Sequence, residues 1–166
     1  AMRALSIIGM VVCAALASVA GEAATPLTEL SGQWSGGGTD RASPMASSQA
    51  TRCRASLKTD PTHLTSTTQC EGAAGLHKSF HLAIAFQGDR FTGTVEQVSS
   101  LRGAAPTRYA GTVTGSRSGD VADFTARFPG MTPNAHVVLT LRSPTSYSMS
   151  VSVLGSTLTE VTLRKR

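Results

Sequence analysis

The feature that most constrains this chain is an alternation of apolar and polar residues that continues from residue 76 almost to the C-terminus. In residues 76–86, for example, every second residue from Phe80 to Phe86 is apolar. A period of two is that of a β-strand with one buried face, because successive side chains point to opposite sides of the sheet. The pattern predicts strands over 76–86, 90–98, 107–115, 121–128, 136–142, 147–153 and 157–164.

Short connections separate these runs. Gly88-Asp89 and Gly119-Asp120 are typical of tight hairpins, and strands joined in this way pair antiparallel. Residues 60–63 link two further strands that carry the cysteines. We expect eight to ten strands, whose shared apolar face is hidden in a sandwich or a closed barrel. The repeated hairpins and inward glycines favour an all-β, antiparallel, up-and-down barrel. The short strands and outward Ser, Thr and Arg residues argue against a transmembrane barrel.

The N-terminus predicts a segment that is removed. Met2-Arg3 is followed by an uncharged run over residues 4–20, which has the pattern of a secretory signal peptide. We expect cleavage after Ala20, with Ala23 as a second candidate, and the loss of Cys13 with the signal. The predicted organisation is a signal peptide over 1–20, a flexible leader over 21–29 and a barrel domain over 30–166. The predicted location is the periplasm or the extracellular space.

Export leaves two cysteines, Cys53 and Cys70, in an oxidising compartment. An even pair in such a compartment predicts one disulfide, with two buried free thiols as the alternative.

The net charge of +5 is spread along the chain, and aromatic residues make up only 5% of it. Scattered positive charge favours solubility or attraction to anionic surfaces, and few stacking residues argue against a nucleic-acid partner. Arg52 and Arg54 flank Cys53 and share the opposite face of its strand. They are therefore either a candidate contact for an anionic partner or a solvated strand face.

Residues that could carry chemistry are dispersed. His77 and His81 lie about 13 Å apart on an extended strand, too far to hold one metal ion together. His136 and Asp123 fall on neighbouring predicted strands, but no serine lies in a Gly-x-Ser-x-Gly motif. Gly36-Gly37-Gly38 lacks the Lys-Ser/Thr ending of a phosphate loop and indicates a flexible strand end or bulge. We expect no enzyme activity, no metal and no cofactor.

The segment Leu30-Ser31-Gly32-Gln33-Trp34 resembles the Gly-x-Trp opening of the calycin barrels, which include the lipocalins. The resemblance implies that Trp34 closes one end of the barrel. Gly-Gln-Trp and a single disulfide are also similar to the bacterial metalloprotease inhibitors. The Trp34–Gly38 opening and the Arg52-Cys53-Arg54 strand resemble uncharacterised exported β-barrel proteins of alphaproteobacteria.

Two function classes follow. One is a monomeric binding module for a small apolar or amphipathic ligand, and the other is an inhibitor of a protease or another envelope enzyme. Whether the barrel interior is filled or hollow decides between the two function classes. A filled barrel favours a protein partner, and a void left by small inward residues such as Gly93, Gly111 and Ala122 favours a ligand. The candidate ligand-binding residues are Trp34, Phe80, Phe91, Tyr109 and Phe124.

Overall fold

The chain folds into a closed barrel of ten antiparallel strands. This computed structural model describes residues 25–73, 75–131 and 133–166. A four-residue 3-10 helix, η1 (Leu27–Leu30), precedes the first strand. The strands are β1 (Gly32–Asp40), β2 (Gln49–Thr59), β3 (His63–Gly72), β4 (Leu76–Gln87), β5 (Arg90–Leu101), β6 (Thr107–Ser118), β7 (Val121–Arg127), β8 (Ala135–Ser143), β9 (Ser146–Val153) and β10 (Ser156–Lys165). The predicted all-β, up-and-down barrel is confirmed.

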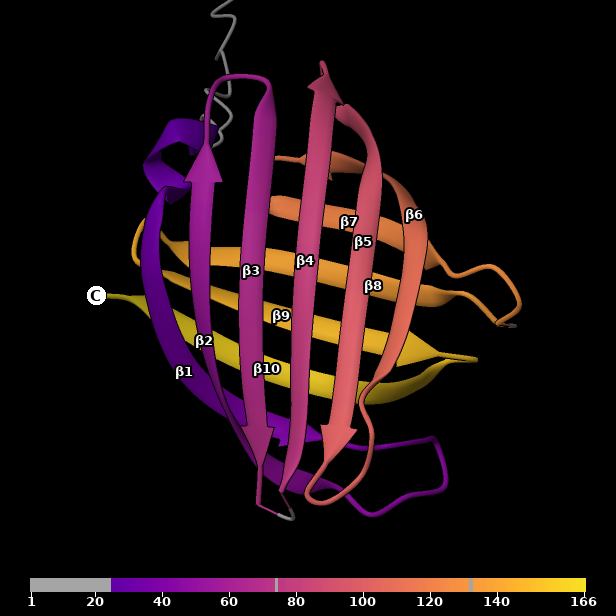
Figure 1. Cartoon of the computed structure of the whole chain (residues 1–166). Coiled ribbons are helices and arrows are strands. Elements are labelled where there is room, and N and C mark those ends of the chain that lie inside the picture. Colours follow the sequence, from indigo (N-terminus) through magenta and orange to yellow (C-terminus); the bar gives the residue numbers. More distant parts are fainter. Residues whose placement is uncertain (1–24, 74, 132) are drawn as a thin grey trace, which may run out of the picture.

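Each strand pairs with its neighbours in the chain, and the first strand pairs with the last. The ladder therefore has no free edge. In Figure 1, β2–β5 run across the front and β7–β10 cross behind them at a steep angle. The barrel is thus flattened, and its apolar core lies between these two crossing layers. Among the described residues no helix is long and apolar enough to cross a bilayer.

The three glycines of β1 are not a flexible end or a bulge, so that prediction was wrong. Gly36, Gly37 and Gly38 lie in the middle of β1, in unbroken register with both neighbouring strands. A Cβ atom on Gly36 would lie 1.9 Å from the carbonyl oxygen of Thr162 on β10. The missing side chains therefore allow β1 and β10 to approach closely where β1 curves from one layer to the other (Figure 1).

The two ends of the barrel differ in how they are closed. At the cap end lie η1 and the tight turns β2–β3, β4–β5, β6–β7 and β8–β9. At the opposite end, which we call the open end, lie the connections over residues 41–48, 73–75, 102–106, 128–134 and 154–155. In Figure 1 the open end is at the lower right, below the front strands and to the right of the crossing strands.

The predicted leader is described from residue 25, and this part lies against the barrel. The backbone N–H of Thr25 donates to Asp120 Oδ1 at 3.0 Å, and the Arg117 guanidinium donates to the Thr25 carbonyl. Leu27 packs on the core and Leu30 is buried in it. Residues 25–30 thus run from the β6–β7 turn to β1 and cover the cap end. The predicted signal peptide lies outside the described residues.

The predicted disulfide is confirmed. Cys53 on β2 and Cys70 on β3 are directly paired in the sheet and joined to each other, and both side chains are buried inside the barrel. The bond lies toward the open end, where β2 begins and β3 ends.

Replacing Cys53 with serine is expected to lower the free energy of unfolding by about 3 kcal/mol. The bond closes a loop with a sequence separation of 17, and a loop of this size restricts the unfolded chain by about that amount. Denaturant unfolding of oxidised wild type and variant measures the loss. Reduction should bring the wild type close to the variant, and equal stability of oxidised and reduced wild type would contradict the prediction.

Candidate functional site

The inward faces of the strands leave an apolar cavity of about 150 Å³ between the two crossing layers. Leucine, valine, phenylalanine and methionine side chains supply most of its wall. The lining residues are Leu30, Leu57, Leu64, Ser66, Thr68, Phe80, Leu82, Val95, Gln97, Phe124, Ala126, Phe128, Ala135, Val137, Leu139, Leu141, Tyr147, Met149 and Val151. Their polar groups are hydroxyls and one amide, and none of the side chains carries a charge at neutral pH.

The inward glycines of β5 and β6, one possible source of a void, do not create this cavity. A Cβ on Gly93 would lie 2.0 Å from the Ala83 carbonyl oxygen, and one on Gly111 would lie 2.2 Å from the Arg127 carbonyl oxygen. Both glycines therefore let neighbouring backbones come together. The cavity lies between the layers, and its wall includes the small residues Ala126 and Ala135 of the crossing strands.

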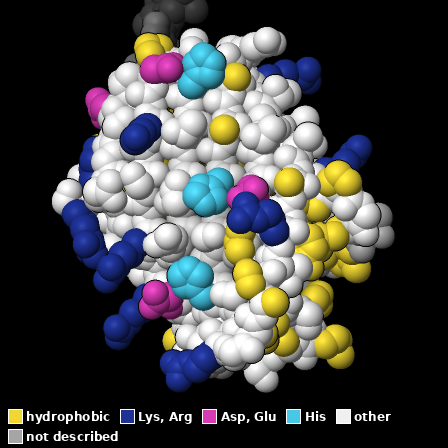
Figure 2. Space-filling model, in the orientation of Figure 1, with side chains coloured by type: hydrophobic (Ala, Val, Ile, Leu, Met, Phe, Trp, Pro, Cys, Tyr) yellow, Lys and Arg dark blue, Asp and Glu magenta, His cyan; other side chains and the backbone are white. Residues whose placement is uncertain are grey.

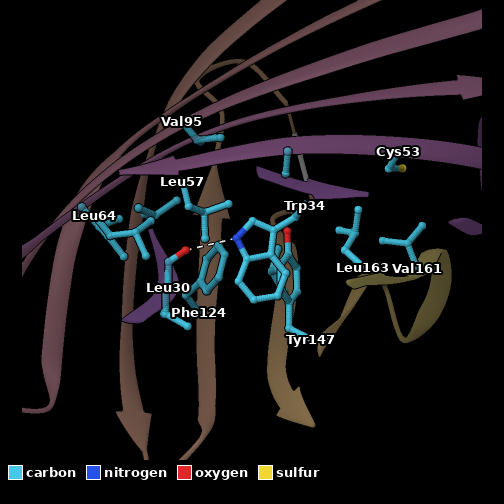
Figure 3. Packing of buried hydrophobic residues seen from close by; sticks show 14 of the residues in the cluster. Leu30, Trp34, Cys53, Leu57, Leu64, Val95, Phe124, Tyr147, Val161 and Leu163 are labelled. Carbon is cyan, nitrogen blue, oxygen red and sulfur yellow. Dashed lines mark hydrogen bonds between the residues drawn. The ribbon is translucent and has the colours of Figure 1, made fainter. Parts of the chain in front are cut away.

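The cap end forms a closed wall of the cavity. The indole N–H of Trp34 donates to the carbonyl of Leu30 at 3.1 Å, and its ring meets the Tyr147 ring at a centroid distance of 5.0 Å (Figure 3). Lys165 Nζ lies 5.7 Å from the centroid of the Trp34 ring. Trp34 is only 1% exposed. It holds η1 in place behind Leu30 and Tyr147, which do line the cavity.

Burial raises the pKa of Tyr147 well above that of an ordinary phenol. The side chain is therefore neutral at any pH that the fold would meet, and it adds no charge to the cavity wall.

The five predicted ligand-binding residues separate into two groups. Phe80 and Phe124 line the cavity, whereas Trp34, Phe91 and Tyr109 do not. Phe91 contacts the rings of Phe86 and Phe124 at centroid distances of 5.1 and 5.7 Å. Tyr109 meets the Phe128 ring at 6.4 Å. The predicted set did not include the lining residues of β8 and β9, namely Val137, Leu139, Leu141, Met149 and Val151.

The cavity is accessible from the open end. Five lining residues toward the cap end are buried: Leu30, Leu57, Leu64, Phe124 and Tyr147. Toward the open end most lining residues are only half-buried, namely Phe80, Gln97, Phe128, Ala135 and Val151, although Ala126 and Val137 there are buried, and Ser66 and Leu141 toward the cap end are half-buried. The lining is thus more exposed toward the open end, and we place the mouth there, between the ends of β4 and β5 and those of β7–β9.

A buried polar cluster lies toward the open end. Asp40 Oδ2 lies 2.6 Å from Lys78 Nζ, and Thr159 Oγ1 donates to Asp40 Oδ1 at 2.6 Å. The side chains of Asp40 and Lys78 are only 7% and 13% exposed. Asp40 is on β1 and Lys78 is on β4, so the ion pair crosses the barrel interior. Next to it, Gln49 Oε1 is buried and accepts no hydrogen bond from the described residues.

The other candidate residues lie on the outer surface. Arg52 and Arg54 are exposed on β2. His81 Nδ1 lies 3.2 Å from Thr67 Oγ1, and His77 lies 3.9 Å from Glu71. The described residues contain no group of three or more His, Cys, Asp or Glu side chains that could hold a metal ion.

His136 and Asp123 do meet, as neighbours on β8 and β7. His136 Nε2 lies 2.7 Å from Asp123 Oδ1, and both side chains are at least half exposed on the outside of the barrel. The pair is separated from the cavity by the sheet, so it forms no part of the candidate site.

The candidate site therefore combines an apolar cavity, capped by η1 and Trp34, with a buried ion pair toward the open end. No family model, no curated protein and no solved structure matches the chain.

Proposed function

We propose that this protein is a non-catalytic binding module for a small apolar ligand, or for the apolar end of an amphipathic one. The observation that carries the proposal is the apolar cavity with its mouth at the open end. Desolvated apolar walls with a few neutral polar groups are typical of such sites. The disulfide supports a role in an oxidising compartment, such as the periplasm.

The size of the cavity limits the ligand. Its volume of about 150 Å³ is that of a cavity that takes up a molecule as small as benzene. Sites for larger ligands usually enclose about 300–1,000 Å³. The enclosed part of the ligand is therefore one ring or a short alkyl segment, and any further part extends through the mouth.

The charges of the wall also limit the ligand. The Lys78 ammonium is the cation closest to the mouth along β4, but Asp40 neutralises it at 2.6 Å. A ligand carboxylate inside the cavity would lose its hydration without gaining a free cation. The enclosed end is therefore uncharged, and it uses at most the neutral groups of Ser66, Thr68 and Gln97.

Benzene and 1-hexanol are expected to enter the cavity in solution. Titration followed by methyl NMR should shift the signals of Val137, Leu139 and Met149, which line the cavity. The signal of Val121 should stay in place, because this residue is exposed at the start of β7 and does not line the cavity. No selective shift up to the solubility limit of both compounds would contradict the proposal.

A filled cavity provides the matched control. Ala126 is buried in the wall, whereas Ala83 is exposed on the outer face of β4. Ala126→Leu should abolish the selective shifts and Ala83→Leu should preserve them. If both variants behave alike, the compounds bind outside the cavity.

The second function class, a protease or envelope-enzyme inhibitor, has less support. The resemblance to metalloprotease inhibitors calls for a free N-terminal segment, but Thr25 to Leu30 are bound to the barrel. Native mass spectrometry of the protein from its own cells distinguishes the two classes. A retained small molecule supports the binding module, and a stoichiometric protein partner supports the inhibitor.

A further inference from the structure

We propose that the open end of the barrel docks on the surface of a lipid bilayer that carries anionic headgroups. The inference goes beyond ligand binding, because it concerns the loops around the mouth and holds whether or not the cavity is occupied.

The first observation is an apolar rim. Five large hydrophobic side chains are exposed among the described residues, and four of them lie at the open end. Met45, Leu101, Met131 and Leu154 are 95%, 55%, 41% and 79% exposed. Figure 2 shows hydrophobic side chains gathered at the right and lower right, which is the side of the open end in this view. The fifth residue, Val121, lies in the β6–β7 hairpin at the cap end.

The second observation is the charge of the same loops. By sequence, the five connections at the open end contain Arg41 and Arg102 and no aspartate or glutamate. The tight turns at the cap end contain the three aspartates Asp60, Asp89 and Asp120, and the strand ends beside them carry Lys58, Arg90, Arg117, Arg142 and Arg164, so cations and carboxylates are mixed there. Exposed apolar side chains together with cations and without carboxylates are complementary to an anionic lipid surface.

The nearest acidic groups do not reverse this charge. Asp40 is buried in its ion pair with Lys78. Glu71, near the end of β3, is 79% exposed on the outer face, and it lies directly opposite Arg52 in the sheet. Arg102, in contrast, is exposed beside Gly75 of the β3–β4 turn.

The third observation is backbone strain at the rim. Leu154 has φ of 51° and is the only non-glycine residue with a positive φ among the described residues. With Gly155 at φ 76°, it forms the turn between β9 and β10. Asparagine or glycine is preferred at such a position, because a Cβ is crowded in the left-handed region. An exposed leucine at this position is therefore unfavourable in the free protein. Burial of its side chain in an apolar medium would offset this cost.

The arrangement favours a bilayer over a protein partner. The rim residues lie on four separate segments around the mouth. Lipid is soft, and it admits each side chain separately while the arginines meet headgroups. Docking in this orientation also places the mouth of the cavity against the acyl chains.

Vesicle flotation of the folded protein tests the proposal. Wild type should bind vesicles of phosphatidylglycerol mixed with phosphatidylcholine, bind phosphatidylcholine alone much less, and be released by salt. The rim variant Met45→Ser/Met131→Ser/Leu154→Asn should bind at least tenfold more weakly, because it loses three apolar contacts. Arg41→Gln and Arg102→Gln should each weaken binding about fivefold.

Matched controls come from the cap end. Val121→Ser removes an exposed hydrophobic side chain there and should leave binding unchanged. Arg90→Gln, beside the β4–β5 turn, should have less effect than either open-end arginine. Leu154→Asn alone should raise the midpoint temperature of unfolding and at the same time weaken vesicle binding. Weaker binding by this variant therefore could not result from a loss of stability.

Several results would overturn the proposal. They are absence of wild-type binding to anionic vesicles, full binding by the rim variant, and a concentration-dependent dimer that the rim substitutions abolish. The last result would assign the rim to a second copy of the chain. Failure of docking is distinguishable from failure of ligand binding, because Ala126→Leu should still bind vesicles and the rim variant should still take up benzene.

Discussion

Trp34→Ala is expected to lower the free energy of unfolding by about 3–5 kcal/mol, the range typical of removing a large aromatic side chain from a core. Trp34 is 1% exposed and contacts Tyr147. Its indole N–H also binds the Leu30 carbonyl at 3.1 Å. The variant would leave a hole beneath η1 and release the cap segment, so the loss should fall in the upper part of the range.

Urea unfolding followed by circular dichroism measures this loss. Trp34→Phe is the matched control, because it keeps a ring against Tyr147 and removes the hydrogen bond to Leu30. It should lose clearly less than the alanine variant. A loss below about 1 kcal/mol for Trp34→Ala would show that the cap end does not depend on the indole.

Asp40→Ala is the second change with a large expected effect, also about 3–5 kcal/mol. It leaves the Lys78 ammonium almost buried without its partner at 2.6 Å, and it removes the acceptor of the Thr159 hydroxyl. Removing one partner of a buried ion pair is strongly destabilising, because the remaining charge is no longer compensated.

The double variant Asp40→Ala/Lys78→Met tests this reason. It removes both charges, so it should be markedly more stable than Asp40→Ala alone. A thermal or urea unfolding series of wild type, the two single variants and the double variant gives the coupling. If the losses of stability in the two single variants add up to the loss in the double variant, the two side chains act independently. That result would contradict the ion pair seen in the structure.

The strands could be predicted because alternation depends on each residue's own neighbours. The run predicted over 76–86 became β4 (Leu76–Gln87), and the run over 121–128 became β7 (Val121–Arg127). The hairpins at Gly88-Asp89 and Gly119-Asp120 formed as predicted, since glycine at φ of 62° and 56° fits these turns. The disulfide was predicted from an even pair of cysteines in an exported chain, and it joins Cys53 and Cys70 on directly paired positions of β2 and β3.

The site could not be predicted to the same extent. Alternation tells which residues point inward, and it placed Phe80, Phe91 and Phe124 correctly on that face. It does not tell how far apart opposite walls stand, which decides whether a ring fills the core, as Phe91 does, or lines a cavity, as Phe80 does.

Contacts between strands that are distant in the chain could not be predicted from the sequence either. Nothing in the sequence indicates that Asp40 meets Lys78, because that pair depends on how the barrel curves back on itself. The triple glycine of β1 was interpreted as flexibility, because the carbonyl groups of β10 that require it lie more than a hundred residues away in the chain.

The pairing of β1 with β10 also determines the order of assembly. Ser35 lies opposite Arg164, so the hydrogen bonds that close the ring join residues from the two ends of the described chain. During synthesis β1 must wait, with one side of its backbone unpaired, until the last strand has left the ribosome. Such distant contacts slow folding, and an unpaired strand is a site for aggregation. This architecture therefore suits a chain that is kept unfolded until it is complete and then folds in a single step.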